Sequence, residues 1–203
     1  MVIRATKLRV NAGASGTMHE VSFEVRAGEL RAFVGGSDEA CREVMSALIA
    51  QQAAAREARG ARSERDAVGY VRGERGGRYE GLQVGRLLGY AAELGLRDEP
   101  VEVRGERVEA MIATLGLGEV RARRLRDLDA LARWKVEVGE CALLGARDWV
   151  VMIEGDEAAR KVKLKVLKEV CRGGAVLAIS GSAVGLEGVE PVGGAVAVAR
   201  EVA

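Results

Sequence analysis

Three acidic residues flank one continuous apolar run in the second half of the chain. Asp148 precedes the run at residues 149–153, and Glu154 and Asp156 follow it. Carboxylates gathered in this way are the ligands of a hard cation such as Ca²⁺ or Mg²⁺. If the run is a strand, it is about 16 Å long at roughly 3.3 Å per residue, and Asp148 and Glu154 lie beyond its opposite ends. At most Glu154 and Asp156 can then meet, and two acids at a strand end are commonplace, so we expect no metal site here.

The other residue types that carry chemistry are few and scattered. The cysteines Cys41, Cys141 and Cys171 are odd in number, far apart and not at metal-ligand spacing, which argues against a disulfide framework and a zinc site. The single histidine, His19, precedes an expected strand, where a surface position is the ordinary one. The only lysine cluster consists of Lys161, Lys163, Lys165 and Lys168. We expect this cluster to form the polar edge of a helix or strand, with recognition of a phosphate or lipid headgroup as the alternative.

The elements that must position these residues follow an α/β pattern. Alternating and apolar runs predict strands at 3–10, 21–25, 30–34, 68–71, 149–153, 175–180 and 195–202. Helical spacing predicts helices at 39–52, 82–96, 103–117, 128–144 and 158–171. The first three strands are expected to enter a sheet in antiparallel order, and 53–66 to be a solvated helix extension or a surface loop. Trp134 and Trp149 are expected to pack in the core.

The composition limits the class of protein. The chain has 203 residues, of which 48% are hydrophobic, and its 31 basic residues nearly balance its 30 acidic ones. It can therefore bury a core, and it has no net field that would attract nucleic acid or an anionic membrane. Neither a signal peptide nor an apolar stretch of the ~20 residues that span a bilayer is recognisable. We expect a cytoplasmic protein without direct membrane insertion, associated with a membrane only through a partner.

The order of the elements and the short strings between them resemble the nucleotide-binding subunit of an ATP-binding cassette (ABC) transporter. The strings are VSFEVRAGEL at 21–30, FVG at 33–35, VGYV at 68–71, YEGLQV at 79–84, LGL at 94–96 and 115–117, ALLG at 142–145, the strand end at Glu154, and GAVLAIS at 174–180. They span nearly the whole chain, and the string at 79–84 most resembles subunits of ABC-2 exporters. The resemblance implies one α/β domain over 1–203: a P-loop NTPase (RecA-like) core with an antiparallel N-terminal β part and an inserted, mostly helical sub-domain. We place the core at 1–73 and 146–203, and the sub-domain at about 74–145.

The phosphate loop of that family is altered in this chain. Its motif, G-x-x-x-x-G-K-[ST], wraps phosphates with backbone N–H groups, bridges them with a lysine and holds Mg²⁺ with a hydroxyl. The matching stretch starts at Gly35 and Gly36, with Cys41 at the lysine position and Arg42 at the hydroxyl position. It also contains three acids: Asp38, Glu39 and Glu43. A like-charge contact at ~4 Å costs from ~1 kcal/mol in water to ~4 kcal/mol at partial burial, so we expect no tight triphosphate binding. Arg42 could replace the lysine only in a remodelled loop, because one residue along a helix turns a side chain by about 100°.

The family's other functional positions are altered as well. They fall at Ala12 (adenine platform), Gly73 (glutamine), 128–132 (signature, here LDALA), Ile153 (Mg²⁺-binding acid) and Ser182 (switch histidine). Only Glu154 is retained, at the general-base position, and a base without phosphate, metal or lysine has little to act on. The resemblance therefore implies a vestigial Glu154, no metal, and no cofactor, with ATP and Mg²⁺ only if the pocket is remodelled. The vestigial nucleotide positions are Gly35, Gly36, Cys41, Arg42, Gly73, Ile153 and Ser182.

The leading interpretation is a catalytically inactive homologue of an ABC ATP-binding subunit, a pseudo-ATPase acting in docking or regulation. The resemblance implies two kinds of partner, a membrane permease and an active ABC ATPase, and a homo- or heterodimer; no nucleic acid is expected. The candidate partner-binding residues are Gly73, Leu82, Val84, Leu87 and Leu88, and burial in the core is the alternative expected for most of the apolar ones. Two alternatives stay open: an active ATPase whose remodelled pocket a partner completes, and a soluble scaffold no longer linked to transport.

Overall fold

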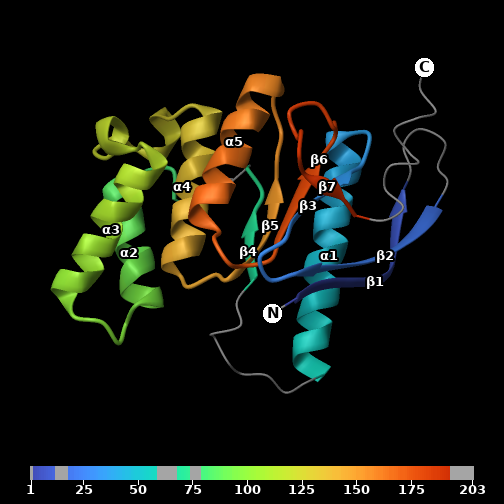
Figure 1. Cartoon of the computed structure of the whole chain (residues 1–203). Helices are drawn as coiled ribbons and strands as arrows, with labels where there is room; N and C mark the ends of the chain where they lie inside the picture. The colour runs from blue at the N-terminus through green and yellow to red at the C-terminus, as the bar shows by residue number, and fades with distance from the viewer. Residues whose placement is uncertain (1, 12–17, 59–67, 74–78, 193–203) are drawn as a thin grey trace.

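The computed structural model describes residues 2–11, 18–58, 68–73 and 79–192, which form two sheets and the helices around them (Figure 1). The strands β1 (Val2–Asn11) and β2 (Met18–Arg26) make an antiparallel pair. The second sheet is parallel, in the order β4-β5-β6-β3-β7. Its strands are β3 (Leu30–Val34), β4 (Val68–Val71), β5 (Asp148–Met152), β6 (Val176–Ser180) and β7 (Glu190–Pro191). The α/β class with an antiparallel N-terminal part is therefore confirmed.

One expectation about the strands is wrong. The strand at 30–34 was expected to continue the antiparallel entry, but β3 pairs in parallel with β6 and β7. Its side chains are buried on both faces, with Ala32 in one hydrophobic core and Phe33 in the other, as is typical of a parallel strand covered by helices. The strand predicted at 195–202 lies outside the described residues.

Helices cover both faces of the parallel sheet. Helix α1 (Asp38–Ala58) and the β1–β2 pair share one core with one face of the sheet. Helices α4 (Ala130–Leu143) and α5 (Glu157–Val170) cover the other face, and α2 (Val84–Gly95) and α3 (Val101–Leu115) form a layer beyond α4 (Figure 1). Two short 3₁₀ turns, Gly118–Val120 and Leu125–Asp127, connect α3 to α4. The predicted helices are present with ends shifted by a few residues, and α1 takes in part of the stretch expected as a helix extension or loop.

The free edge of β1 is closed by two glutamines of α1. Gln51 donates to the carbonyl of Thr6 at 2.7 Å and accepts from its N–H at 3.2 Å, and Gln52 donates to the carbonyl of Arg4 at 2.8 Å. Side-chain amides thus satisfy backbone groups that another strand would otherwise pair with. The contacts fix α1 against the β1–β2 pair and set the direction from which α1 leaves β3.

The carboxyl ends of β3, β4, β5 and β6 lie at the same edge of the sheet, because these strands are parallel. Four loops therefore meet there: 35–37, 72–73, 153–156 and 181–182. Ligands of open α/β sheets bind at this edge. It is also the edge that holds most of the positions singled out from the sequence.

Candidate functional site

The loop between β3 and α1 is short and closed. Helix α1 begins at Asp38, so only residues 35–37 separate it from the strand. The hydroxyl of Ser37 accepts from the N–H of Ala40 at 3.2 Å, and the carbonyl of Ser37 accepts from the N–H of Cys41 at 3.1 Å. These two N–H groups serve the first helical turn, so they do not line an open cradle for a phosphate.

Cys41, which the resemblance matches to the lysine of the phosphate motif, is a packing residue. Its side chain is buried beside Phe33 and Val44. A Cβ placed on Gly35 would lie 2.9 Å from its Sγ, so the thiol packs against the backbone of the loop. Burial raises the pKa of the thiol from 9.0 to about 11. Cys41 is therefore neutral at physiological pH and offers a phosphate no positive charge.

The raised pKa of Cys41 predicts a measurable pH dependence of stability. An unfolded thiol ionises near its ordinary pKa of 9.0, whereas the folded one keeps its proton to about 11. Between these values the unfolded state binds fewer protons, so stability that is present below pH 9 is lost as the pH rises toward 11. Two pKa units correspond to about 2–3 kcal/mol. Between about pH 8 and about pH 11, we expect the free energy of unfolding, measured in urea, to fall by about 2–3 kcal/mol less for the Cys41→Ala variant than for the wild type. Parallel profiles for the two proteins would rule out this role for the thiol.

An acid lies against the closed loop. A Cβ placed on Gly181, just after β6, would lie 2.8 Å from Oδ1 of Asp38 and 3.2 Å from its backbone nitrogen. The start of α1 and the end of β6 are thus in close contact, with the carboxylate of Asp38 between them. A phosphate in the usual position would meet this negative charge.

Arg42 and Glu154, the two charged residues of the vestigial set, pair with each other. Nη2 of Arg42 lies 3.4 Å from Oε1 of Glu154, across the gap between α1 and the end of β5. The Arg42 side chain is 51% exposed, and an exposed pair of this kind is worth at most about 1 kcal/mol. The pair nonetheless directs the guanidinium toward a carboxylate, not into a phosphate site.

The other described positions matched to the nucleotide-binding motifs have structural roles. Ile153 is 0% exposed in the core shared with α4 and α5, and its N–H donates to the carbonyl of Ile179 at 2.8 Å. Gly36 and Gly73 have positive φ angles of 75° and 78°, which glycine adopts without strain. The hydroxyl of Ser182 accepts from the N–H of Val184 at 3.2 Å within its own turn. None of these residues presents a group suited to Mg²⁺ or phosphate.

Lys163 corrects the expectation for the lysine cluster. It lies on α5 and is 7% exposed, not on a solvated edge. Its Nζ donates to the carbonyl of Glu154 at 2.8 Å and lies 5.4 Å from the ring centre of Trp134, a cation–π contact. Burial lowers the pKa of Lys163, while the carboxylates of Glu154, Asp38 and Glu137 act to raise it. The one buried cation in the described part of the chain therefore already faces several carboxylates.

Glu137 was not identified from the sequence, although it organises the same edge. This residue of α4 is 5% exposed, and its carboxylate accepts from the N–H of Arg72 at 3.0 Å and from that of Gly73 at 2.9 Å. The signal was available, because Glu137 stands between Val136 and Val138 in an apolar helix. Trp134, one turn earlier, donates its indole N–H to the carbonyl of Met152 at 3.0 Å. We call Trp134, Glu137 and Lys163 the buried lock, because together they tie α4 and α5 to the ends of β4 and β5.

Most of the candidate partner-binding residues are unavailable. Val84, Leu87 and Leu88 are buried in the core that α2 shares with α3 and α4, so their side chains are not exposed to a partner in this structure. They lie on the apolar face of α2, which is buried against α3 and α4. Leu82 and Gly73 remain partly exposed.

The acids that flank β5 lie apart from one another and have structural roles. Asp148 lies at the opposite end of β5 from Glu154, where it is buried and accepts from the N–H of Ala175 at 3.0 Å. Asp156 caps α5 by accepting from the N–H of Ala159 at 2.8 Å. Across residues 2–11, 18–58, 68–73 and 79–192, no three His, Cys, Asp or Glu side chains are grouped to hold a metal ion.

His19 belongs to β2, and its side chain lies outside the described part.

Comparison with solved structures shows which fold this is. An ABC transporter of the metal-chelate type, in an inward-facing conformation, superposes with a TM-score of 0.61 at 11% identity, over 93% of this chain and 76% of that chain. CbiO1 from Clostridium perfringens, part of the ABC transporter complex CbiONQ, gives 0.58 at 11% identity, over 88% and 77%. No protein-family model matches the sequence, and neither does any curated protein. Within the described helices, none combines the length and apolarity needed to cross a bilayer.

Proposed function

We propose that this chain, which has the fold of ABC transporter ATPase subunits, is a catalytically inactive relative of them that serves as a docking or regulatory subunit. One observation carries the proposal: the place of the phosphate-binding lysine is taken by the buried, neutral thiol of Cys41. Phosphoryl transfer depends on positioning the phosphates and neutralising their charge, and this loop offers neither an open cradle nor a free cation.

The charges around the loop support the same conclusion. Arg42 is paired with Glu154, and Lys163 faces Glu154, Asp38 and Glu137. A nucleotide would have to displace these carboxylates from both cations before either could neutralise it. No observation favours the alternative of a working ATPase with a remodelled pocket, because the group that would serve as its base, Glu154, is held by the arginine that would serve as its cation.

The kind of partner follows from the fold. One neighbour in structure is part of a transporter complex, and the other is a transporter. We therefore propose a membrane permease, an active ABC ATPase or both as partners, with this chain joined to the membrane only through them.

A hydrolysis assay with a matched variant tests the loss of catalysis. We expect phosphate release by the wild type to equal the background, and the Glu154→Gln variant to be indistinguishable from it, because a base without a bound nucleotide has nothing to activate. Phosphate release that the Glu154→Gln variant abolishes would show a working ATPase. The assay includes the chain together with any copurifying ATPase, so that a pocket completed by a partner would be detected.

A further inference from the structure

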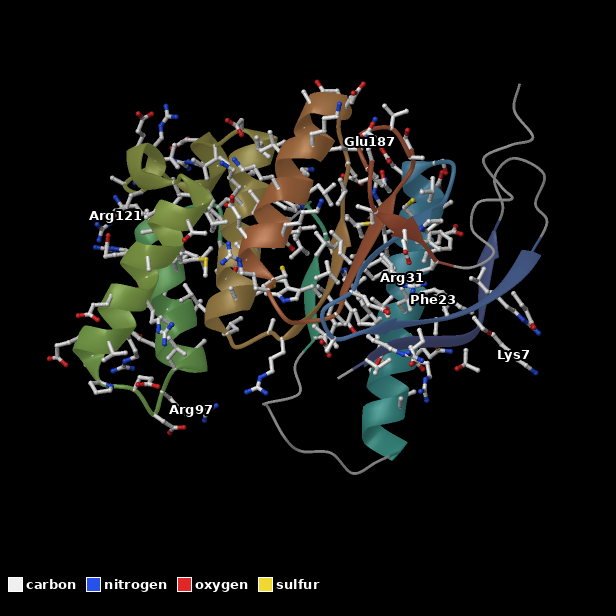
Figure 2. All side chains as sticks on the ribbon, in the orientation of Figure 1. Lys7, Phe23, Arg31, Arg97, Arg121 and Glu187 are labelled. Atoms are coloured by element: carbon white, nitrogen blue, oxygen red, sulfur yellow. The ribbon has the colours of Figure 1, made fainter. Side chains whose placement is uncertain are left out.

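A row of arginines stands out on the far side of the helical layer from the β1–β2 pair. We define the arginine ridge as Arg121, Arg123, Arg124 and Arg126; the first three lie between the two 3₁₀ turns that join α3 to α4, and Arg126 lies in the second turn. All four are exposed, and Leu125 among them is buried and anchors the segment in the core. Arg121, labelled in Figure 2, marks the ridge at the outer rim of the layer formed by α2 and α3.

The backbone of the ridge is held in place. The N–H of Leu125 donates to the carbonyl of Leu82 at 3.0 Å, and the N–H of Arg126 to that of Glu80 at 3.1 Å. In the other direction, the carbonyl of Arg123 accepts from the N–H of Val84 at 3.1 Å. The ridge is thus a segment of turns, joined to the residues before α2 by these backbone hydrogen bonds and by a single β-bridge between Gln83 and Arg124. A partner that binds it has to order the arginine side chains only, which keeps the entropic cost of binding low.

Only some of the arginines of the ridge pair with carboxylates. Residues 121–133 carry five arginines and two aspartates, a net charge of +3 in a chain whose total is +1. Arg121 pairs with Glu109 at 2.6 Å, and Arg126 has a weak contact with Asp127 at 3.8 Å. The carboxylate of Asp129 is occupied as the cap of α4, where it accepts from the N–H of Ala132. The guanidinium groups of Arg123 and Arg124 form no hydrogen bond or ion pair with any residue that the structure describes.

We propose that the arginine ridge binds an acidic segment of a partner protein, through carboxylates that pair with Arg123 and Arg124. Guanidinium groups match carboxylates in two-point contacts, and arginine is over-represented among the residues that dominate binding at protein interfaces. Tyr79, one residue before Glu80, is also exposed. Tyrosine is another residue type that is over-represented among those that dominate binding at interfaces.

A protein segment fits the ridge better than a membrane or a nucleic acid. Acidic residues adjoin the ridge: Glu109 and Asp127 pair with Arg121 and Arg126, and Glu80 and Glu119 lie in the segments next to it. A broad polyanion would meet these acids together with the arginines, whereas a short acidic segment can meet the two unpaired guanidiniums alone. The proposal rests on the proposed function only in taking the partner to be a protein.

Fluorescence anisotropy with a labelled ten-residue glutamate peptide tests the ridge on the full chain. We expect saturable binding that weakens as salt rises from about 50 mM to about 300 mM. The double variant Arg123→Glu/Arg124→Glu should bind at least about tenfold more weakly. The control Lys165→Glu/Arg172→Glu makes the same change in net charge at exposed positions of α5 and the turn after it, and should stay within about twofold of the wild type. Circular dichroism checks that both variants are folded.

Three results would overturn the proposal: no binding of the peptide, equal losses in the two double variants, or tighter binding to phosphatidylserine vesicles or to oligothymidylate than to the peptide. These outcomes are separate from those of the proposed function. A chain that hydrolyses ATP but binds the peptide at the ridge refutes only the loss of catalysis, and a chain with neither property refutes only the ridge.

Discussion

Replacing Ile153 by aspartate is expected to lower the free energy of unfolding by about 4 kcal/mol or more. The resemblance to the ABC family implies an acid at this position, yet here Ile153 is fully buried in an apolar core. A carboxylate there would lose its water without a hydrogen-bond donor built to receive it. The measurement is equilibrium unfolding in urea, read by tryptophan fluorescence.

The Ile153→Val variant is the matched control, and its expected cost is only about 0.5–1.5 kcal/mol, because it removes one methylene without adding a charge. If the aspartate variant were as stable as the valine variant, the end of β5 would be able to accept a charged residue. The structural argument against a metal-binding acid would then fail.

Replacing Glu137 by leucine should have the second-largest effect, a loss of about 3–5 kcal/mol. The carboxylate accepts two backbone hydrogen bonds, from Arg72 and Gly73, and hydrogen bonds to a charged group are worth about 1.5–3 kcal/mol each. The leucine variant leaves both N–H groups without an acceptor and leaves Lys163 with one carboxylate fewer. Urea unfolding gives the loss, and hydrogen exchange should show faster exchange at residues 72–73.

Glu137→Gln separates the hydrogen bonds from the charge. Glutamine keeps the shape and one acceptor oxygen, so its cost should be about half that of leucine. Equal costs for the two variants would show that the negative charge is what matters at this position. A loss below about 1 kcal/mol for both would show that the buried lock contributes little to the attachment of α4.

The elements of this fold could be predicted because their patterns are local. The buried strands β5 and β6 are continuous apolar runs, and α2, α3 and α4 repeat apolar residues at helical spacing. The placement of β3 was wrong because pairing direction depends on which strands flank it. Here β6 and β7 follow it by well over 100 residues along the chain.

The candidate site was only partly predictable, for a related reason. Reading residues against the family's motifs identified Cys41, Arg42, Ile153 and Glu154 as positions of interest. The motifs do not include Glu137, and Lys163 was placed in an exposed lysine cluster, because the burial of both residues depends on how α4 and α5 pack. The apolar face of α2 posed the same difficulty, because its pattern does not distinguish burial in the core from contact with a partner; in the structure it packs on α3 and α4.

Calorimetric titration of the full chain with MgATP tests the central claim most directly. The closed loop, the neutral thiol at position 41 and the carboxylates around Lys163 predict no saturable heat of binding up to about 1 mM nucleotide, corresponding to less than about 4 kcal/mol of binding free energy. An active ABC ATPase titrated in the same buffer provides the positive control. One-to-one binding with a micromolar Kd would contradict the account, because it would require a phosphate site that this arrangement of residues does not provide.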